Sequence, residues 1–121
     1  MTTQELKQRT FEFGIRVVSA VEALPKTETA RIVGRQLLRA GTSVGANYRA
    51  AARARSRADF VAKLGIVEEE CDESSYWIEM IIALKVLKRS RLTSLLTETN
   101  ELLAIAVASI KTARHSRRVV N

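Results

Sequence analysis

Proline and glycine are scarce in this chain of 121 residues, which contains one proline, Pro25, and five glycines. A β-sandwich or β-barrel of this length needs turn residues roughly every 8–12 positions. Aromatic residues make up only 5% of the chain, whereas Ala, Leu, Val, Ile, Arg and Glu are common. This composition favours helices over strands. The scarcity of turn-forming and aromatic residues therefore predicts an all-α protein.

Cysteine and long hydrophobic runs are equally scarce. The single cysteine, Cys71, excludes an internal disulfide and is typical of a reducing compartment. No run approaches the ~18 apolar residues of a transmembrane helix. The first residues, MTTQELKQRTFEF, contain no apolar core of the length found in signal peptides. These absences predict a cytoplasmic protein that does not bind a membrane.

Acidic residues are too few to balance the basic ones. Lys and Arg number 20 against 13 Asp and Glu, so the formal net charge is +7. A basic balance is typical of proteins that bind nucleic acid or another polyanion, although proteins that bind neither also show it. Hydrophobic residues make up 46% of the chain. The size and composition predict one folded domain, residues 1–121.

Apolar residues recur every three or four positions in four segments, as on the buried face of amphipathic helices. Pro25 ends the first segment, and Thr27 and Ser56 are expected N-caps of the second and third. Ser90 is a possible cap of the fourth, and residues 114–121 lose the pattern and are expected to fray. Four long helices with short connections predict an antiparallel up-down-up-down four-helix bundle. The expected limits are roughly 4–23, 27–54, 56–88 and 92–113.

The stretch RAGTSVGANYRAAARARS places two glycines, Gly41 and Gly45, inside the second segment. The apolar pattern keeps its phase across both, which indicates one continuous helix rather than a loop. Each glycine costs about 1 kcal/mol relative to alanine in a helix interior, so a close helix contact is expected to offset that cost. The stretch is not a phosphate-binding loop, because it has no Gly-Lys-Ser/Thr ending and follows no strand. The expected helix-packing residues are Gly41, Ser43, Gly45 and Asn47.

No set of residues suits catalysis or metal binding. The only histidine, His115, lies in the tail, so the Glu-x-x-His pairs of a di-iron bundle are missing. The acidic run EEECDE at 68–73 is expected to be a solvated face that pairs with arginines of the second helix or of a neighbouring subunit. Cys71 lies on the apolar stripe and is expected to behave as a small hydrophobic residue. The sequence predicts no enzyme, no cofactor and no metal site.

Arginines are the candidate binding residues. Arg49 and Arg53 lie four residues apart at the end of the second segment, and the turn that follows contains Arg55 and Arg57. Because aromatic residues are not interleaved with them, phosphate contact is expected rather than base stacking. A salt-bridged or solvated surface is the alternative, and the protein is then an interaction scaffold without a nucleic-acid role. The second-choice residues share one helix face at spacings of four: Arg31, Arg35 and Arg39.

The stretch SVGANYRAAARARSRADFVAKLGIVEEECDESSYWIEMI resembles the signature of the 23S rRNA intervening-sequence proteins. The resemblance is carried by Ser43 and Asn47, by the basic turn RARS and by Asp59 followed by Phe60. It extends over nearly the whole chain, from Phe11 to about residue 110, and implies a four-helix bundle. Many members have Glu-Gly shortly after the asparagine, where this chain has Ala-Ala at 50–51.

The resemblance also implies an assembly and partners. Family members assemble as pentameric rings. Similar bundles are accessory proteins of diversity-generating retroelements, in which a basic homopentamer binds a reverse transcriptase and nucleic acid. The resemblance therefore implies a homo-oligomer, with five copies, whose further partners are RNA or DNA and a reverse transcriptase or another protein.

Overall fold

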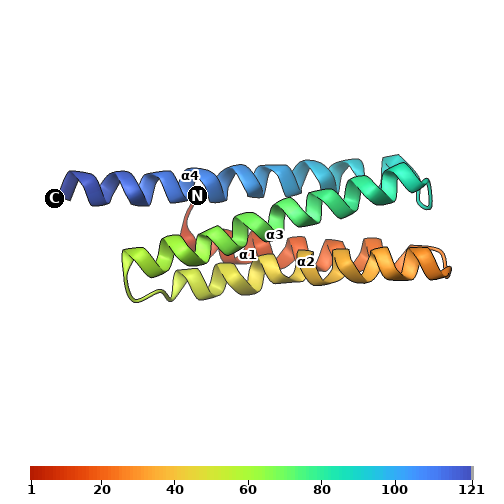
Figure 1. Ribbon diagram of the computed structural model, residues 1–121, viewed down its shortest axis with the longest axis horizontal. Coiled ribbons are helices and arrows are strands. Elements are labelled where there is room, and N and C mark those ends of the chain that lie inside the picture. Colours follow the sequence, from red (N-terminus) through yellow and green to blue (C-terminus); the bar gives the residue numbers. More distant parts are fainter. Residues whose placement is uncertain (121) are drawn as a thin grey trace.

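The computed structural model describes the backbone of residues 1–120 and the side chains of residues 1–116. Figure 1 shows that successive long helices run in opposite directions, with both termini and the α2–α3 turn toward one end of the molecule. The predicted all-α, up-down-up-down four-helix bundle is confirmed. Its elements are α1 (Thr3–Glu22), α2 (Glu28–Ala52), α3 (Arg57–Leu84), the short 3-10 helix η1 (Arg89–Arg91) and α4 (Thr93–Val120).

Side-chain caps begin three of the helices. The hydroxyl of Thr2 accepts the backbone N–H of Glu5, whose carboxylate accepts the N–H of Thr2 in return. The hydroxyls of Thr27 and Ser56 each accept a backbone N–H three residues later. Each cap satisfies a donor that has no partner within the helix. The predicted caps at Thr27 and Ser56 are confirmed.

The connection between α3 and α4 differs from the sequence-based expectation. The third helix was expected to reach about residue 88, but it ends before Lys85, which adopts a left-handed conformation with φ of 57°. A left-handed residue stops an α-helix, because its backbone turns away from the helical path. Ser90 lies inside η1, and α4 begins three residues after it. The expectation that Ser90 caps the fourth helix is therefore wrong.

The end of α4 lies beyond the expected limit of about residue 113, because α4 continues through Val120. The fraying of residues 114–121 stays a prediction. Neither proline nor glycine interrupts this segment, so nothing in its backbone chemistry stops the helix. Asn121 lies outside the described residues.

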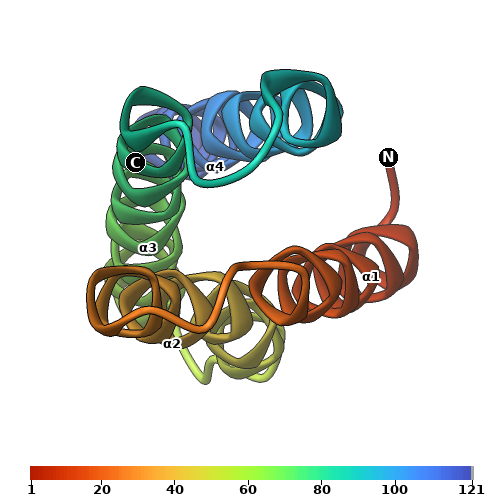
Figure 2. The same ribbon diagram turned by 90° about the vertical axis from the view of Figure 1, so that its right-hand side faces the viewer.

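The helices follow one another around the core in chain order, as Figure 2 shows end-on. Each consecutive pair packs along its length, whereas α1 and α4 contact each other much more sparsely. Where these outer helices meet, the guanidinium of Arg9 donates to both carboxylate oxygens of Glu98, each at 2.7 Å. All four helices contribute to one apolar core, which includes Phe13, Val17, Leu37, Val44, Leu64, Ile78, Leu92 and Leu102.

Two glycines of α2 lie directly against α1. A Cβ on Gly41 would come within 2.7 Å of the side chain of Val17, and one on Gly45 within 3.2 Å of the carbonyl oxygen of Thr10. Both separations are shorter than ordinary van der Waals contacts. The missing side chains therefore let the α1 and α2 backbones approach each other closely.

Ser43 and Asn47 have a different role from the two glycines. The Ser43 hydroxyl donates to the carbonyl oxygen of Arg39 at 2.6 Å, and the Asn47 amide donates to the carbonyl oxygen of Ser43 at 2.8 Å. Both bonds lie within α2. The half-buried Asn47 thereby finds the partner that a buried polar group needs.

Candidate nucleic-acid interface

The end of the bundle where α1 begins and α2 ends carries a cluster of positive side chains. Because α1 and α2 are antiparallel, Lys7 lies close to Arg49 and Arg53, and the three line one hollow of about 320 Å³. Two neutral side chains, Gln4 and Gln8, complete the lining. Among the described residues, no carboxylate forms an ion pair with these three cations. Unpaired cations beside neutral amides suit a phosphate group.

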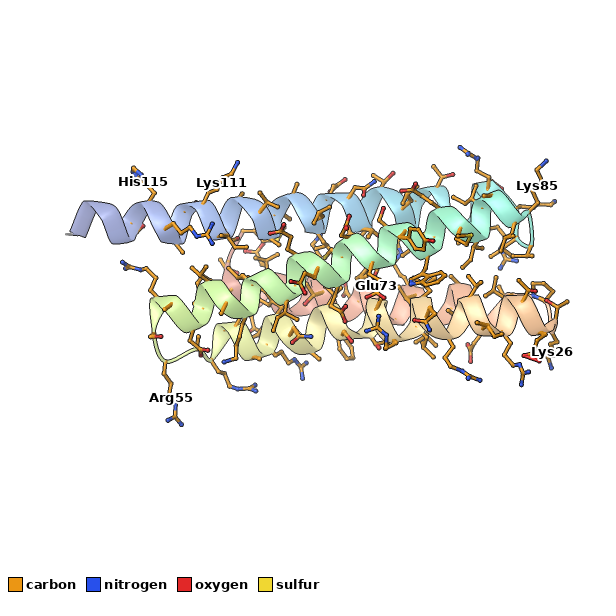
Figure 3. All side chains as sticks on the ribbon, viewed as in Figure 1. Lys26, Arg55, Glu73, Lys85, Lys111 and His115 are labelled. Atoms are coloured by element: carbon orange, nitrogen blue, oxygen red, sulfur yellow. The ribbon has the colours of Figure 1, made fainter. Side chains whose placement is uncertain are left out.

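Arg55 and Arg57 extend this cluster into the α2–α3 turn. Both side chains are exposed, and Figure 3 shows Arg55 pointing away from the bundle. The cap at Ser56 holds the turn between them. The neighbouring carboxylate, Asp59, binds the Lys63 ammonium at 2.7 Å, and this contact lowers the pKa of Asp59. In the part of the chain that the structure describes, neither arginine has an ion-pair partner.

The five cations Lys7, Arg49, Arg53, Arg55 and Arg57 are called the basic end below. Four of them fall between positions 49 and 57, from the end of α2 through the following turn to the first residue of α3, and the tertiary fold adds Lys7 of α1. The N-termini of α1 and α3 lie at the same end of the bundle (Figure 1). The C-termini of α2 and α4 point to this end as well (Figure 1), so the opposite partial charges of the helix ends largely cancel and the positive potential comes from the side chains.

Arg49 also takes part in a second contact. Its guanidinium carbon lies 5.7 Å from the centre of the Phe11 ring, which is a cation–π distance. Phe11 is half exposed, so the pair lies at the surface between α1 and α2. Arg49 therefore borders both the basic hollow and an apolar surface beside it.

The second-choice arginines differ from one another. Arg31 pairs with Glu28 of the preceding turn. Arg39 pairs with two carboxylates of α3, and its Nη1 lies 3.1 Å from Glu70 Oε2. The contact with Arg39 lowers the pKa of the second carboxylate, Glu73. The expected pairing of the acidic run with arginines of the second helix is thus confirmed at one arginine.

Arg35, the third member of this set, is exposed and has no ion-pair partner among the described residues. It lies 14 residues before Arg49, which is nearly four helical turns. The basic hollow contains Arg49 and Arg53 of the first-choice arginines and none of the second-choice set.

Sequence reasoning missed Lys7, and it missed a second basic region at the opposite end of the bundle. Four cations, Lys85, Lys88, Arg89 and Arg91, line a hollow of about 780 Å³ there. The sequence pattern indicated only a possible cap, Ser90, at this point. The signal was nevertheless present, because KVLKRSR contains four cations in seven residues and no acid. Lys7 had no such local signal, since its neighbours come from another helix.

Cys71 and His115 lie on different helices and in different surroundings. Cys71 is fully buried in α3, and burial raises the pKa of its thiol to about 12. His115 is exposed near the end of α4, and Figure 3 shows it pointing outward. Within the described residues, no three histidine, cysteine or acidic side chains gather as metal ligands would. In that same part of the chain, every helix is too short or too polar to cross a membrane.

Comparison with known proteins extends over most of the chain. Residues 2–108 match the family model described as 23S rRNA-intervening sequence protein. A crystal structure of a protein of unknown function, from the S23 ribosomal protein family of Bacteroides thetaiotaomicron, is similar with a TM-score of 0.84 and 34% identity. The similarity covers 92% of this chain and 99% of that one. No curated protein matches the chain significantly.

Proposed function

The chain belongs to the family of 23S rRNA-intervening sequence proteins, and from this premise we propose that it is a non-enzymatic, homo-oligomeric bundle that binds RNA or DNA through phosphate contacts. The observation that carries the proposal is the basic end. Three of its cations, Lys7, Arg49 and Arg53, line one hollow, and Arg55 and Arg57 follow them in the chain. None of the five has an ion-pair partner among the described residues. Cations that have no carboxylate partner remain available to an external anion.

Binding through phosphate contacts depends strongly on salt and little on base sequence. Each neutralised phosphate releases a counterion, so affinity falls steeply as salt rises. If one chain neutralises four phosphates, the affinity for duplex DNA falls roughly 100-fold between 50 and 200 mM salt. Phosphate contacts carry no base information, so the binding is tolerant of sequence.

Self-association strengthens such binding. We propose five copies in a ring, as the family resemblance implies. A formal charge of +7 per chain then becomes +35 in the assembly. Several weak contacts made by one assembly act together as a multivalent interaction. Exposed apolar side chains such as Phe11, Ile15 and Tyr76 support self-association, because they are available to a partner surface.

A filter-binding titration with structured RNA and with duplex DNA, at low and at moderate salt, tests the proposal. The variant Arg53→Glu/Arg55→Glu is expected to lose binding. The matched control, Lys85→Glu/Lys88→Glu, changes the net charge equally at the opposite end and is expected to bind nearly as well as the wild type. Light scattering and circular dichroism establish that both variants still fold and assemble.

Each other outcome has a defined meaning. If the wild type shows no salt-dependent binding to either polymer, the nucleic-acid role is wrong. The remaining candidate is then an interaction scaffold, for a reverse transcriptase or another protein, which the exposed apolar side chains favour. If the control variant loses binding and the Arg53→Glu/Arg55→Glu variant retains it, the site lies at the opposite end of the bundle.

A further inference from the structure

Large apolar side chains are exposed mainly on two surfaces among the described residues. One surface belongs to α1 and α2, and the other belongs to α3, whereas α4 exposes none in its described part. Scattered exposed apolar residues are normal, but grouped ones mark interaction surfaces. The first surface exposes Phe11 and Ile15, which line one hollow, and the second exposes Ile66 and Tyr76. Three further exposed apolar side chains lie apart from these pairs: Met1, Ile32 and Leu84.

The first surface contains a groove between α1 and α2, called the α1–α2 groove. It has a volume of about 280 Å³, and the side chains of Phe11, Ile15 and Val18 form its α1 wall. Its α2 wall contains Thr42, Gly45 and Ala46, and Gly14 completes the lining together with Thr10 and Arg49. The only charge in the lining is thus the guanidinium of Arg49.

The surroundings of the groove on α2 are positive. Arg35 and Arg49 lie seven residues before and after Thr42, so all three share one face of the helix. Neither arginine has an ion-pair partner among the described residues. The α1–α2 groove is therefore apolar inside and positively charged along its α2 side.

The second surface is an outward-facing stripe of α3, called the α3 stripe. It consists of Ile66, Glu69, Asp72, Tyr76 and Glu79, which follow one another at spacings of three or four and are all exposed. Its three acidic side chains form no ion pair with the described residues. Between positions 63 and 85 the helix contains no lysine or arginine at all. The stripe is apolar at intervals and otherwise negative.

We propose that the α3 stripe of one copy docks into the α1–α2 groove of the next copy. The inference rests on the proposed self-association and names the two surfaces that produce it. Apolar side chains of the stripe meet the apolar lining of the groove, and its carboxylates meet the unpaired arginines beside the groove. A second copy is the occupant because this chain itself carries a surface that matches the groove in both polarity and charge.

The contact is head-to-tail, because the two surfaces are different parts of the molecule. Figure 2 shows α3 standing to one side of the layer formed by α1 and α2. An open chain of copies then keeps one unused groove at one end and one unused stripe at the other until a ring closes. Arg49 belongs to the subunit contact in this arrangement, and the polyanion site keeps Lys7, Arg53, Arg55 and Arg57.

Two variants and their mixture test the contact. The groove variant Ile15→Glu/Ala46→Glu places carboxylates where the acidic stripe would dock. The stripe variant Asp72→Lys/Tyr76→Lys places cations opposite the arginines. All four positions are exposed, so both variants are expected to fold. The matched control Ala104→Glu/Ala108→Glu lies on the outward face of α4 and is expected to assemble like the wild type.

Light scattering of each variant alone is expected to give the 13.5 kDa mass of one chain. The equimolar mixture is expected to associate, because the stripe variant supplies an intact groove to the intact stripe of the groove variant. A mixture that stays monomeric overturns the head-to-tail contact. If both variants assemble like the wild type, the surfaces are wrong while the self-association stands. If the wild type itself is a monomer, the proposed self-association fails, and this contact fails with it.

Discussion

Glycine-to-alanine substitutions at Gly45 and, as a comparison, at Gly65 test whether the backbones of α1 and α2 approach each other closely. Alanine is better than glycine in a helix interior by about 1 kcal/mol. At Gly65 of α3, an added Cβ would meet no atom within 4 Å. Gly65→Ala is therefore expected to stabilise the protein by about that amount, because the gain in helix propensity is not opposed by a clash.

At Gly45 the same substitution meets the α1 backbone. The Cβ would lie 3.2 Å from the carbonyl oxygen and 3.3 Å from the carbonyl carbon of Thr10. These atoms move only if the helices separate, and overpacking of this kind costs about 1–3 kcal/mol. The gain in helix propensity offsets about 1 kcal/mol of this cost. Gly45→Ala is therefore expected to lower the free energy of unfolding by about 0–2 kcal/mol. Gly45→Leu adds more bulk and is expected to destabilise further.

Urea unfolding at one fixed protein concentration provides the assay, since self-association makes stability depend on concentration. The two alanine variants are expected to differ by about 1–3 kcal/mol in free energy of unfolding. With an m value of about 1.5 kcal/mol/M, that difference separates their midpoints by roughly 0.7–2 M. If Gly45→Ala raises the midpoint as much as Gly65→Ala does, the close approach of α1 and α2 at this point is refuted.

Three further predictions concern single side chains. Arg9→Lys is expected to lower the free energy of unfolding by about 1–2 kcal/mol in urea titrations, because lysine cannot form the bidentate hydrogen bonds that Arg9 makes to Glu98. An unchanged urea midpoint would contradict this role. Burial raises the pKa of the Cys71 thiol to about 12, so Cys71 is expected to resist a thiol reagent at pH 8 until the protein unfolds. Fast labelling of the native protein would contradict this burial. Arg39→Gln is expected to destabilise the protein near pH 7. The difference from wild type should vanish as pH falls through the lowered pKa of Glu73, because a lowered folded-state pKa stabilises only while the carboxylate is ionised; a difference that persists at acid pH would contradict the linkage.

The secondary structure followed from local patterns. Apolar residues at three- and four-residue spacings and the caps at Thr27 and Ser56 act within one helix, so the linear sequence contains them in full. The unbroken phase across Gly41 and Gly45 likewise predicted one continuous α2, which the structure confirms. The pattern missed the end of α3, because the left-handed backbone at Lys85 follows from no periodic signal.

The candidate site depended on how the helices pack against one another. Periodicity tells which face of a helix is buried, but it does not give the offset of one helix along another. That offset places Lys7 beside Arg53 at the basic end. It also lets Arg39 reach two carboxylates of α3 and leaves Arg35 without one among the described residues.

The same limit applies to the ion pair that joins the first and last helices. Arg9 and Glu98 are 89 positions apart in the chain, yet their side chains meet at 2.7 Å. An ion pair forms only within about 4 Å, whereas one turn of a helix is about 5.4 Å long. A shift of a single turn between two helices would exchange every charged partner and leave the apolar pattern of each helix unchanged. The amphipathic pattern alone is therefore sufficient for the bundle, and the arrangement of charges on its surface is settled by packing in three dimensions.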